Sequence, residues 1–182
     1  MATPAGNVTR PGISVGSISE FSLFFHVRPG HEREIREAVT QLQQSPGYRP
    51  GDYDVPIRSI HEARFVLFDG DTRLVFATSF DGPWDAYMDD FATSGPTLQL
   101  FDLIFQHVEG YDGLPDTAAV KAFVLGAQVS AAAYARNYPG TVKEIRKAER
   151  VNRAFQQVLD DPEAATALQR PALKPLLDEA AD

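Results

Sequence analysis

The fold is decided by residues 20–44, EFSLFFHVRPGHEREIREAVTQLQQ. From Glu20 to Arg28 apolar and polar side chains alternate, which is typical of a strand buried on one face. Pro29-Gly30 interrupts the alternation, and the next apolar residues recur at i, i+4 and i+7: Ile35, Val39 and Leu42. This spacing and the acidic first turn predict an amphipathic helix directly after the strand.

Two further strand-like stretches follow, residues 59–68 and 72–80. They are separated by Asp69-Gly70-Asp71, and an Asp-Gly pair readily adopts the positive φ of a tight hairpin turn. The sequence therefore predicts a β-hairpin. Pro83 then suits the first position of a second helix, because its φ is already helical and its missing N–H is not needed there.

The rest of the chain predicts a mixture of helices and one weaker strand. Residues 97–108 are apolar enough for a buried third helix, and residues 116–126 suit a short one. Residues 129–138, VSAAAYARNY, are interpreted as a weak strand, although alanine tolerates either state. A last helix is expected over 142–159, where Thr141 and Glu144 have the spacing of a capping box.

The resulting order is β-α-β-β-α-α-(α)-β-α, the split βαβ arrangement with added helices. We therefore expect an α+β protein with a ferredoxin-like antiparallel sheet and helices on one face. The expected organisation is a flexible N-terminal arm (1–18), one domain (19–160) and an acidic C-terminal tail (161–182).

Composition excludes several classes of function. The chain has no cysteine, so disulfides and thiolate chemistry are excluded. Its net charge of −8 and scattered basic residues argue against nucleic-acid binding. No signal-like start and no run of about 20 apolar residues is present, so we expect a cytoplasmic protein without a membrane partner. Phosphate-binding glycine loops, Gly-x-Ser-x-Gly and His-Glu-x-x-His are absent from the sequence.

The second face of the expected sheet needs a cover or a ligand. If Phe21, Leu23 and Phe25 face the helices, strand parity directs Phe24 and His26 to the other side, which is then partly apolar. A second copy of the chain is the commonest cover for such a surface, so we expect a homodimer. A pocket for a small hydrophobic molecule between sheet and helices is a compatible alternative.

Residues 21–38, FSLFFHVRPGHEREIREA, resemble the strand, Pro-Gly-x-Glu and helix opening of the dimeric α/β-barrel superfamily. That superfamily includes antibiotic-biosynthesis-type monooxygenases, haem-degrading monooxygenases, chlorite dismutases and dye-decolourising peroxidases. Residues 60–91, IHEARFVLFDGDTRLVFATSFDGPWDAYMDDF, are also similar to bacterial proteins of peroxidase-like assignment. The resemblance implies a barrel of two sheets and, in several branches, a pocket for haem or an oxidisable aromatic substrate.

The resemblance also suggests individual roles. Asp81, in a partial match to the Asp-Gly motif of the dye-decolourising peroxidases, would be a distal acid. His107, near the end of the third helix, lies where haem-binding relatives present an axial imidazole. His26, on the outer face of the first strand, is the second candidate for a cofactor pocket, whereas His31 is expected on a solvent-exposed helix face.

Residue chemistry adds a third suggestion. A neutral imidazole at His61 could move a proton while the guanidinium of Arg64 stabilised negative charge. Strand parity opposes that pair, because residues i and i+3 point to opposite faces. The candidate catalytic residues are therefore His61, Arg64 and Asp81, and no metal site is expected.

Three functions remain open. The first is an oxidoreductase of monooxygenase or peroxidase type, haem-linked or cofactor-free, acting on a small hydrophobic molecule. The second is a non-catalytic dimer that binds a ligand or a partner. The third is a cofactor-free cyclase or isomerase that uses one acid–base residue of shifted pKa.

Overall fold

The structure is a computed structural model and describes residues 14–15, 17–129 and 131–180. The chain forms two compact units, Met1–Val142 and Lys143–Asp182. This division falls at the first residue of the helix over 142–159, which the sequence places inside the domain ending at residue 160.

The predicted N-terminal arm, residues 1–18, lies mostly outside the described residues. Its described part includes β1 (Ser14–Val15), which pairs with the start of the next strand.

The first unit is built on one antiparallel sheet. Its long strands are β2 (Ile18–His26), β3 (Ile60–Phe68) and β4 (Arg73–Asp81), and β5 (Gln128–Val129) is short. The strands lie in the order β1-β2-β4-β3, with β5 also paired to β2. Strands β2 and β4 are therefore central, with β3 at one edge of the sheet and β5 on the other side of β2. This order is that of the ferredoxin-like fold, which confirms the predicted fold class.

Register separates the two faces of the sheet as predicted. Leu23 of β2 lies opposite Phe76 of β4, which lies opposite Phe65 of β3. This row packs towards the helices, and Leu23 and Phe76 are almost fully buried. On the other face Phe24 and Val66 are 41% and 44% exposed. The second face is thus partly apolar, as the sequence indicates.

The hairpin between β3 and β4 depends on three consecutive residues with positive φ. Asp69, Gly70 and Asp71 have φ of 57°, 64° and 68°. Asp is among the few residues with a side chain that tolerate this region, and glycine adopts it freely. The predicted Asp-Gly turn is confirmed.

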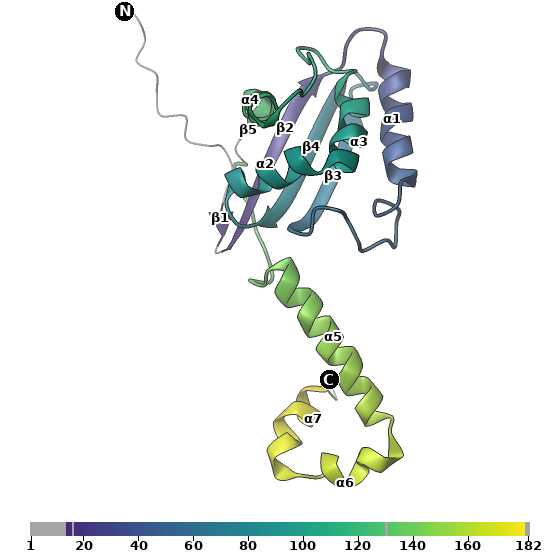
Figure 1. Cartoon of the computed structure of the whole chain (residues 1–182), viewed down its shortest axis with the longest axis vertical. Helices are drawn as coiled ribbons and strands as arrows, with labels where there is room; N and C mark the ends of the chain where they lie inside the picture. Colours follow the sequence, from purple (N-terminus) through teal and green to yellow (C-terminus); the bar gives the residue numbers. More distant parts are fainter. Residues whose placement is uncertain (1–13, 16, 130, 181–182) are drawn as a thin grey trace, which may run out of the picture. The chain divides into compact units, whose positions relative to one another are not determined.

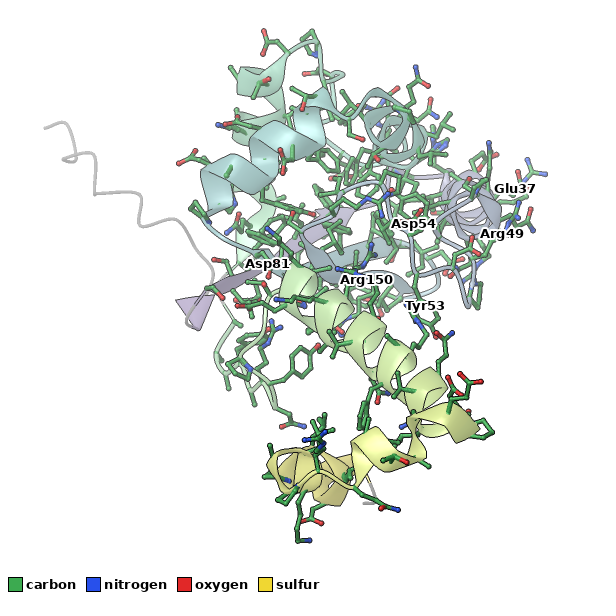
Figure 2. The ribbon with its side chains drawn as sticks, turned by 60° about the horizontal axis from the view of Figure 1, so that its bottom comes forward. Glu37, Arg49, Tyr53, Asp54, Asp81 and Arg150 are labelled. Carbon is green, nitrogen blue, oxygen red and sulfur yellow. The ribbon has the colours of Figure 1, made fainter. Side chains whose placement is uncertain are left out.

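Four helices accompany this sheet, and Figure 1 shows α2 and α3 lying across its front. They are α1 (Glu32–Gln44), α2 (Trp84–Thr93), α3 (Gly95–Phe105) and α4 (Thr117–Ala127). Helix α4 begins at an Asp116 cap, whose carboxylate accepts the Ala119 N–H at 2.8 Å. The loop between α1 and β3 carries Tyr53, which is 86% exposed and labelled in Figure 2.

The strand predicted over residues 129–138 is wrong for most of its length. Among the described residues of this stretch only Val129 pairs with β2, together with Gln128 before it. The alanines that follow offer little side chain to pack on a sheet, and alanine is depleted in strands. Arg136 instead folds the segment back on itself, because its guanidinium donates to the carbonyls of Tyr138 at 2.7 Å and Gly140 at 3.1 Å.

The second unit consists of helices. Helix α5 (Val142–Leu159) has the predicted bounds. The tail holds more helix than the single turn that the sequence suggests: α6 (Ala165–Leu168), α7 (Lys174–Ala180) and two 3₁₀ turns, Pro162–Ala164 and Pro171–Leu173. Each 3₁₀ turn begins with a proline, which suits the start of a helix. None of the helices in the described ranges has both the length and the apolar character needed to cross a membrane.

Candidate functional site

Aromatic side chains fill the space between the sheet and the helices. The ring of Phe101 on α3 lies at the centre, with its centroid 4.8 Å from Phe91, 5.2 Å from Phe65 and 5.4 Å from Phe76. A void of about 10 Å³ remains in this layer, room for about one water. The void is lined by Phe21, Leu23, Phe76, Tyr87, Met88, Phe91, Phe101, Phe105 and Val124.

Tyr87 on α2 is the one lining residue of this void with a polar side chain. It is 2% exposed and stacks on Phe80 with 4.0 Å between ring centroids. Its hydroxyl is buried and forms no hydrogen bond with any described residue. Thr78 interacts with this phenol and lowers the pKa of Tyr87 against the larger effect of burial. The Thr78 hydroxyl donates to the Glu62 carbonyl at 3.0 Å, which leaves its oxygen able to accept, but the Tyr87 hydroxyl lies outside the geometry of a hydrogen bond.

Burial has a clear consequence for this phenol. Removal from water raises the pKa of Tyr87 far above its usual value, so the group is protonated at neutral pH. A buried hydroxyl without a partner is costly, and such groups are rare in folded proteins. Tyr87 therefore offers an unused hydrogen-bond donor to whatever could enter the aromatic layer.

A groove of about 190 Å³ opens beside this layer, between α1, the edge strand β3 and α3. It is lined by Val39, Leu42, Gln43, Tyr48, Ala63, Arg64, Phe65 and Phe101. Phe101 belongs to both the groove and the buried void, so this one ring separates them. The groove is thus an outer chamber in front of the aromatic layer.

Gln43, Arg64 and Tyr48 are the polar residues that line the groove, and only Tyr48 among them carries a hydroxyl. Its hydroxyl donates to Thr97 Oγ1 at 3.4 Å, and burial raises the pKa of Tyr48, so this phenol is also protonated. Arg64 borders the groove, but it lies opposite Ala77, on the other face of the sheet. There its side chain is 65% exposed, with Nη1 3.8 Å from Glu62 Oε1.

The structure brings together two of the three predicted catalytic residues. His61 is the extra residue of a β-bulge between Ile60 and Glu62, and bulges re-aim side chains. Its Nε2 lies 2.7 Å from Asp81 Oδ1, and its side chain is only 4% exposed. The guanidinium beside it comes from Arg136, with Nη2 3.1 Å from His61 Nδ1, and not from Arg64 as the sequence suggested.

This cluster holds the segment that leads into α5. The other carboxylate oxygen of Asp81 accepts the Val142 N–H at 2.9 Å, at the first residue of that helix. Asp81 follows Phe80, which faces the helices, so by alternation it lies on the face opposite the groove. The Asp81 carboxylate thus joins His61 to Val142, and we call His61, Asp81, Arg136 and the Val142 N–H the clasp. Its contacts are structural, and catalysis by His61 and Asp81 stays a prediction.

The candidate haem ligands are placed differently from one another. His107 follows α3 rather than lying on it, and its Nδ1 is 3.0 Å from His31 Nδ1. Burial, with the charge of His31 next in importance, lowers the pKa of His107. His26 is exposed at the end of β2, on the open face. The imidazole of His107 faces another histidine rather than an apolar slot, so these residues do not fit haem.

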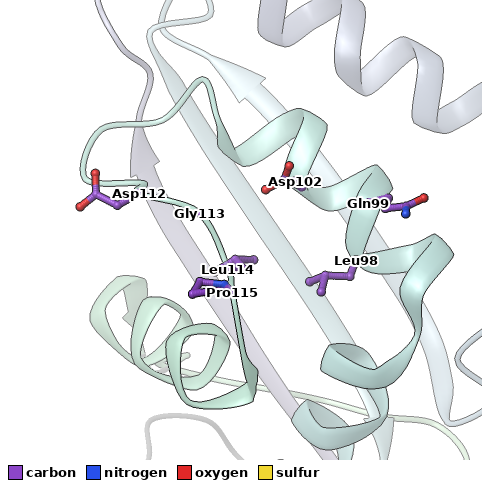
Figure 3. A pocket seen from close by; sticks show the side chains of 7 residues that line it. All are labelled: Leu98, Gln99, Asp102, Asp112, Gly113, Leu114 and Pro115. Atoms are coloured by element: carbon purple, nitrogen blue, oxygen red, sulfur yellow. The ribbon is translucent and has the colours of Figure 1, made fainter.

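A second surface cavity lies between α3 and the loop that precedes α4, as Figure 3 shows. Its volume is about 390 Å³. The hydroxyl of Tyr111 donates to Asp102 on its wall, and Figure 3 shows Asp112 turned outward on the loop. The cavity has no aromatic wall: it is lined by Leu98, Gln99, Asp102, Asp112, Gly113, Leu114 and Pro115. It is therefore less suited than the groove to an aromatic molecule.

Sequence reasoning missed Tyr48 and Arg136. The helical spacing of Trp84, Tyr87 and Phe91 predicts that Tyr87 is a core residue, and its burial confirms this. Arg136 and Tyr48 lie in irregular segments, where no periodicity indicates what a side chain meets. Within residues 14–15, 17–129 and 131–180, no group of three or more histidine or acidic side chains is placed to hold a metal ion.

Comparison with known proteins adds two structural likenesses. No protein-family model and no curated protein matches the chain. A Bordetella bronchiseptica protein assigned as an antibiotic biosynthesis monooxygenase is similar over 51% of this chain and 87% of its own, with 16% identity and a TM-score of 0.39. The tetracenomycin F2 cyclase of Streptomyces glaucescens, a type II polyketide cyclase, is similar over 66% of this chain and 98% of its own, with 7% identity and a TM-score of 0.38.

The Bordetella protein carries the name of the monooxygenase branch that residues 21–38 resemble. At such identities and TM-scores the two likenesses carry no argument about activity. The ferredoxin-like topology rests on the strand order itself.

Proposed function

We propose that this chain binds a small, largely aromatic molecule in the groove between α1, β3 and α3 and transforms it without a bound cofactor, as a monooxygenase or a cyclase. The observation that carries this proposal is the continuity of the groove, through Phe101, with an aromatic layer that ends at the unpartnered hydroxyl of Tyr87. Ligand sites typically combine apolar walls with a few placed polar groups.

The size of the groove limits the ligand. Its volume of about 190 Å³ is below the roughly 300–1,000 Å³ of sites for drug-sized molecules. A molecule of one or two rings fits this chamber as it stands. A larger ring system would have to displace Phe101 and enter the aromatic layer.

The polar groups of the groove suit chemistry on a ketone or a phenol. Tyr48 in the groove and Tyr87 behind Phe101 are both protonated, and a neutral phenol donates a hydrogen bond to an oxygen that gathers negative charge. Tyr48 would exchange its 3.4 Å bond to Thr97 for a bond to the ligand. An acidic C–H beside such an oxygen can lose its proton to water and form a carbanion. Its reaction with O₂ converts CH₂ into C=O and releases water. Its attack on a second carbonyl instead closes a ring, and the new hydroxyl then leaves as water.

No carboxylate or imidazole is among the residues that line the groove. A substrate that is itself acidic therefore suits this site better than one that needs a strong base from the protein. Monooxygenation and cyclisation of phenolic ketones both begin from such an acidic substrate, so the groove suits either reaction.

The open face of the sheet favours a second candidate function, a non-catalytic dimer. Phe24, Val66, Phe68 and Val129 all lie on that face and are 36–50% exposed. Exposed apolar rows of this kind mark interaction surfaces. A homodimer through this face leaves the groove on the opposite face open, so it is compatible with the proposed activity.

Binding of 1-naphthol, measured by isothermal titration calorimetry, tests the proposed site. Ala63→Phe should abolish binding by filling the groove, and Tyr48→Phe should weaken it by about tenfold or less, the worth of one hydrogen bond of about 1 kcal/mol. Tyr53→Phe is the matched control, because this phenol lies on the same loop and is 86% exposed. Equal binding by wild type and Ala63→Phe would remove the groove from consideration.

Turnover is tested separately. A bicyclic phenolic ketone that carries an acidic CH₂ and a second carbonyl on a side chain is incubated with the protein in an oxygen electrode, and the product masses are measured by mass spectrometry. Monooxygenation predicts O₂ uptake and a gain of O for 2H, and cyclisation predicts loss of water without O₂ uptake. Tight binding with neither product would favour the binding protein.

A further inference from the structure

Two histidine side chains converge at the junction of α1 with the segment after α3. The Nδ1 atoms of His31 and His107 are 3.0 Å apart, and the rings are tilted by 57°. The backbone holds both residues in place, because Arg28 N donates to the His107 carbonyl at 2.8 Å and His31 N donates to the Arg28 carbonyl at 3.0 Å. The convergence is therefore built into the fold at two points of the chain.

The separation of the two nitrogens selects a coordination geometry. For a metal–nitrogen bond of about 2.0–2.1 Å, two nitrogens 3.0 Å apart subtend about 94° at the ion. This angle is close to the roughly 90° between neighbouring ligands in square-planar and octahedral complexes, and smaller than the roughly 109° of a tetrahedron. Imidazole nitrogen in a tetragonal arrangement suits Cu(II) and Ni(II) more than Zn(II).

Charge of both signs lies beside the pair. Glu34, in the first turn of α1, acts electrostatically on both imidazoles; its Oε1 pairs with Arg33 at 3.0 Å, and its Oε2 has no hydrogen-bond partner among the described residues. Arg28 donates to the carbonyls of Val108 at 2.9 Å and Tyr111 at 2.6 Å, and its positive charge lowers the pKa of His107, which favours the neutral imidazole that a metal ion needs. Both histidines are half-buried, so solvent can reach the pair.

We propose that His31 and His107 form a site for one divalent transition-metal ion of tetragonal preference, Cu(II) first, bound by the two Nδ1 atoms. No third histidine, cysteine or acidic side chain in the described ranges is placed as a ligand, so water completes the coordination. Glu34, which also pairs with Arg33, lies within electrostatic range of both histidines. The proposal is independent of the activity proposed for the groove, which lies between α1, β3 and α3.

The test is titration of the full-length chain with Cu(II) in a non-coordinating buffer, followed by calorimetry and electron paramagnetic resonance. The expected result is one equivalent of Cu(II) with a tetragonal spectrum and splitting from two nitrogens. His31→Gln and His107→Gln should each weaken binding by at least about 100-fold, more than the roughly 10–100-fold that loss of a supporting partner costs. His26→Gln is the matched control, because His26 is exposed at the end of β2, and it should bind as wild type does.

Far-UV circular dichroism keeps the variants interpretable. The His31 side chain makes no capping hydrogen bond to α1, so His31→Gln should fold, and it decides the outcome if His107→Gln does not. Binding that survives in His31→Gln, or a spectrum with one nitrogen, would overturn the site. Absence of stoichiometric binding would show that the two imidazoles are a hydrogen-bonded pair only.

Discussion

Replacement of Tyr87 by phenylalanine should stabilise the protein. The change deletes one hydroxyl that is buried without a partner and leaves the ring stacked on Phe80. An unsatisfied buried polar group costs about 1–3 kcal/mol, so Tyr87→Phe should raise the free energy of unfolding by about 1–2 kcal/mol. For a protein of this size that is a rise in Tm of about 2–8 °C.

Urea unfolding followed by fluorescence measures the effect, because Trp84 is the single tryptophan of the chain and is buried. Tyr111→Phe is the matched control, since the hydroxyl of Tyr111 donates to Asp102. That variant should be destabilised by about 1 kcal/mol or more. If Tyr87→Phe lost as much stability as Tyr111→Phe, the Tyr87 hydroxyl would be satisfied in the folded protein and its place in a ligand site would be refuted.

Three further predictions concern pH, the clasp and the open face. Burial raises the pKa of Tyr87, so above pH 10 the unfolded chain releases the Tyr87 proton while the folded protein keeps it. The free energy of unfolding should therefore fall by up to about 1.4 kcal/mol per pH unit. Urea midpoints measured from pH 9 to 11 should fall less steeply for Tyr87→Phe than for the wild type. Asp81→Ala should cost about 2–4 kcal/mol in urea unfolding, because it leaves His61 and the Val142 N–H without their partner, whereas a loss as small as that of the exposed control Glu62→Ala would contradict the clasp. Phe24→Asp should convert a dimer into a monomer in light scattering, while Tyr53→Asp should not; a monomeric wild type would contradict dimerisation through the open face.

The sheet could be predicted because its signals are local. Alternation from Glu20 to Arg28 places Phe21, Leu23 and Phe25 on the helix side, where all three are buried. The turn at residues 69–71 is specified by side chains that tolerate positive φ. Both signals lie within a few residues, so no knowledge of distant partners is needed.

The strand predicted over residues 129–138 failed for the opposite reason. Its alanines carry no strong preference, and the outcome depends on Arg136, whose carbonyl partners and His61 are tertiary contacts. The strand propensity of single residues therefore predicts little where tertiary contacts determine the backbone conformation.

The candidate site could be predicted only in part. The sequence proposes His61 and Asp81 as catalytic residues, which stays a prediction, and strand parity alone could not foresee the bulge that turns His61 towards Asp81. It did indicate an aromatic pocket between sheet and helices. The groove depends on Tyr48 from an irregular loop, and a missing hydrogen bond such as that of Tyr87 is visible only once every neighbour is placed.

The central claim is that the groove between α1, β3 and α3 holds an aromatic ligand. Chemical-shift mapping of the labelled protein with 1-naphthol tests it most directly. We predict that the largest shifts fall on Val39, Ala63, Phe65 and Phe101, which line the groove. Shifts concentrated instead on Phe24, Val66 and Phe68 of the open face would contradict the account.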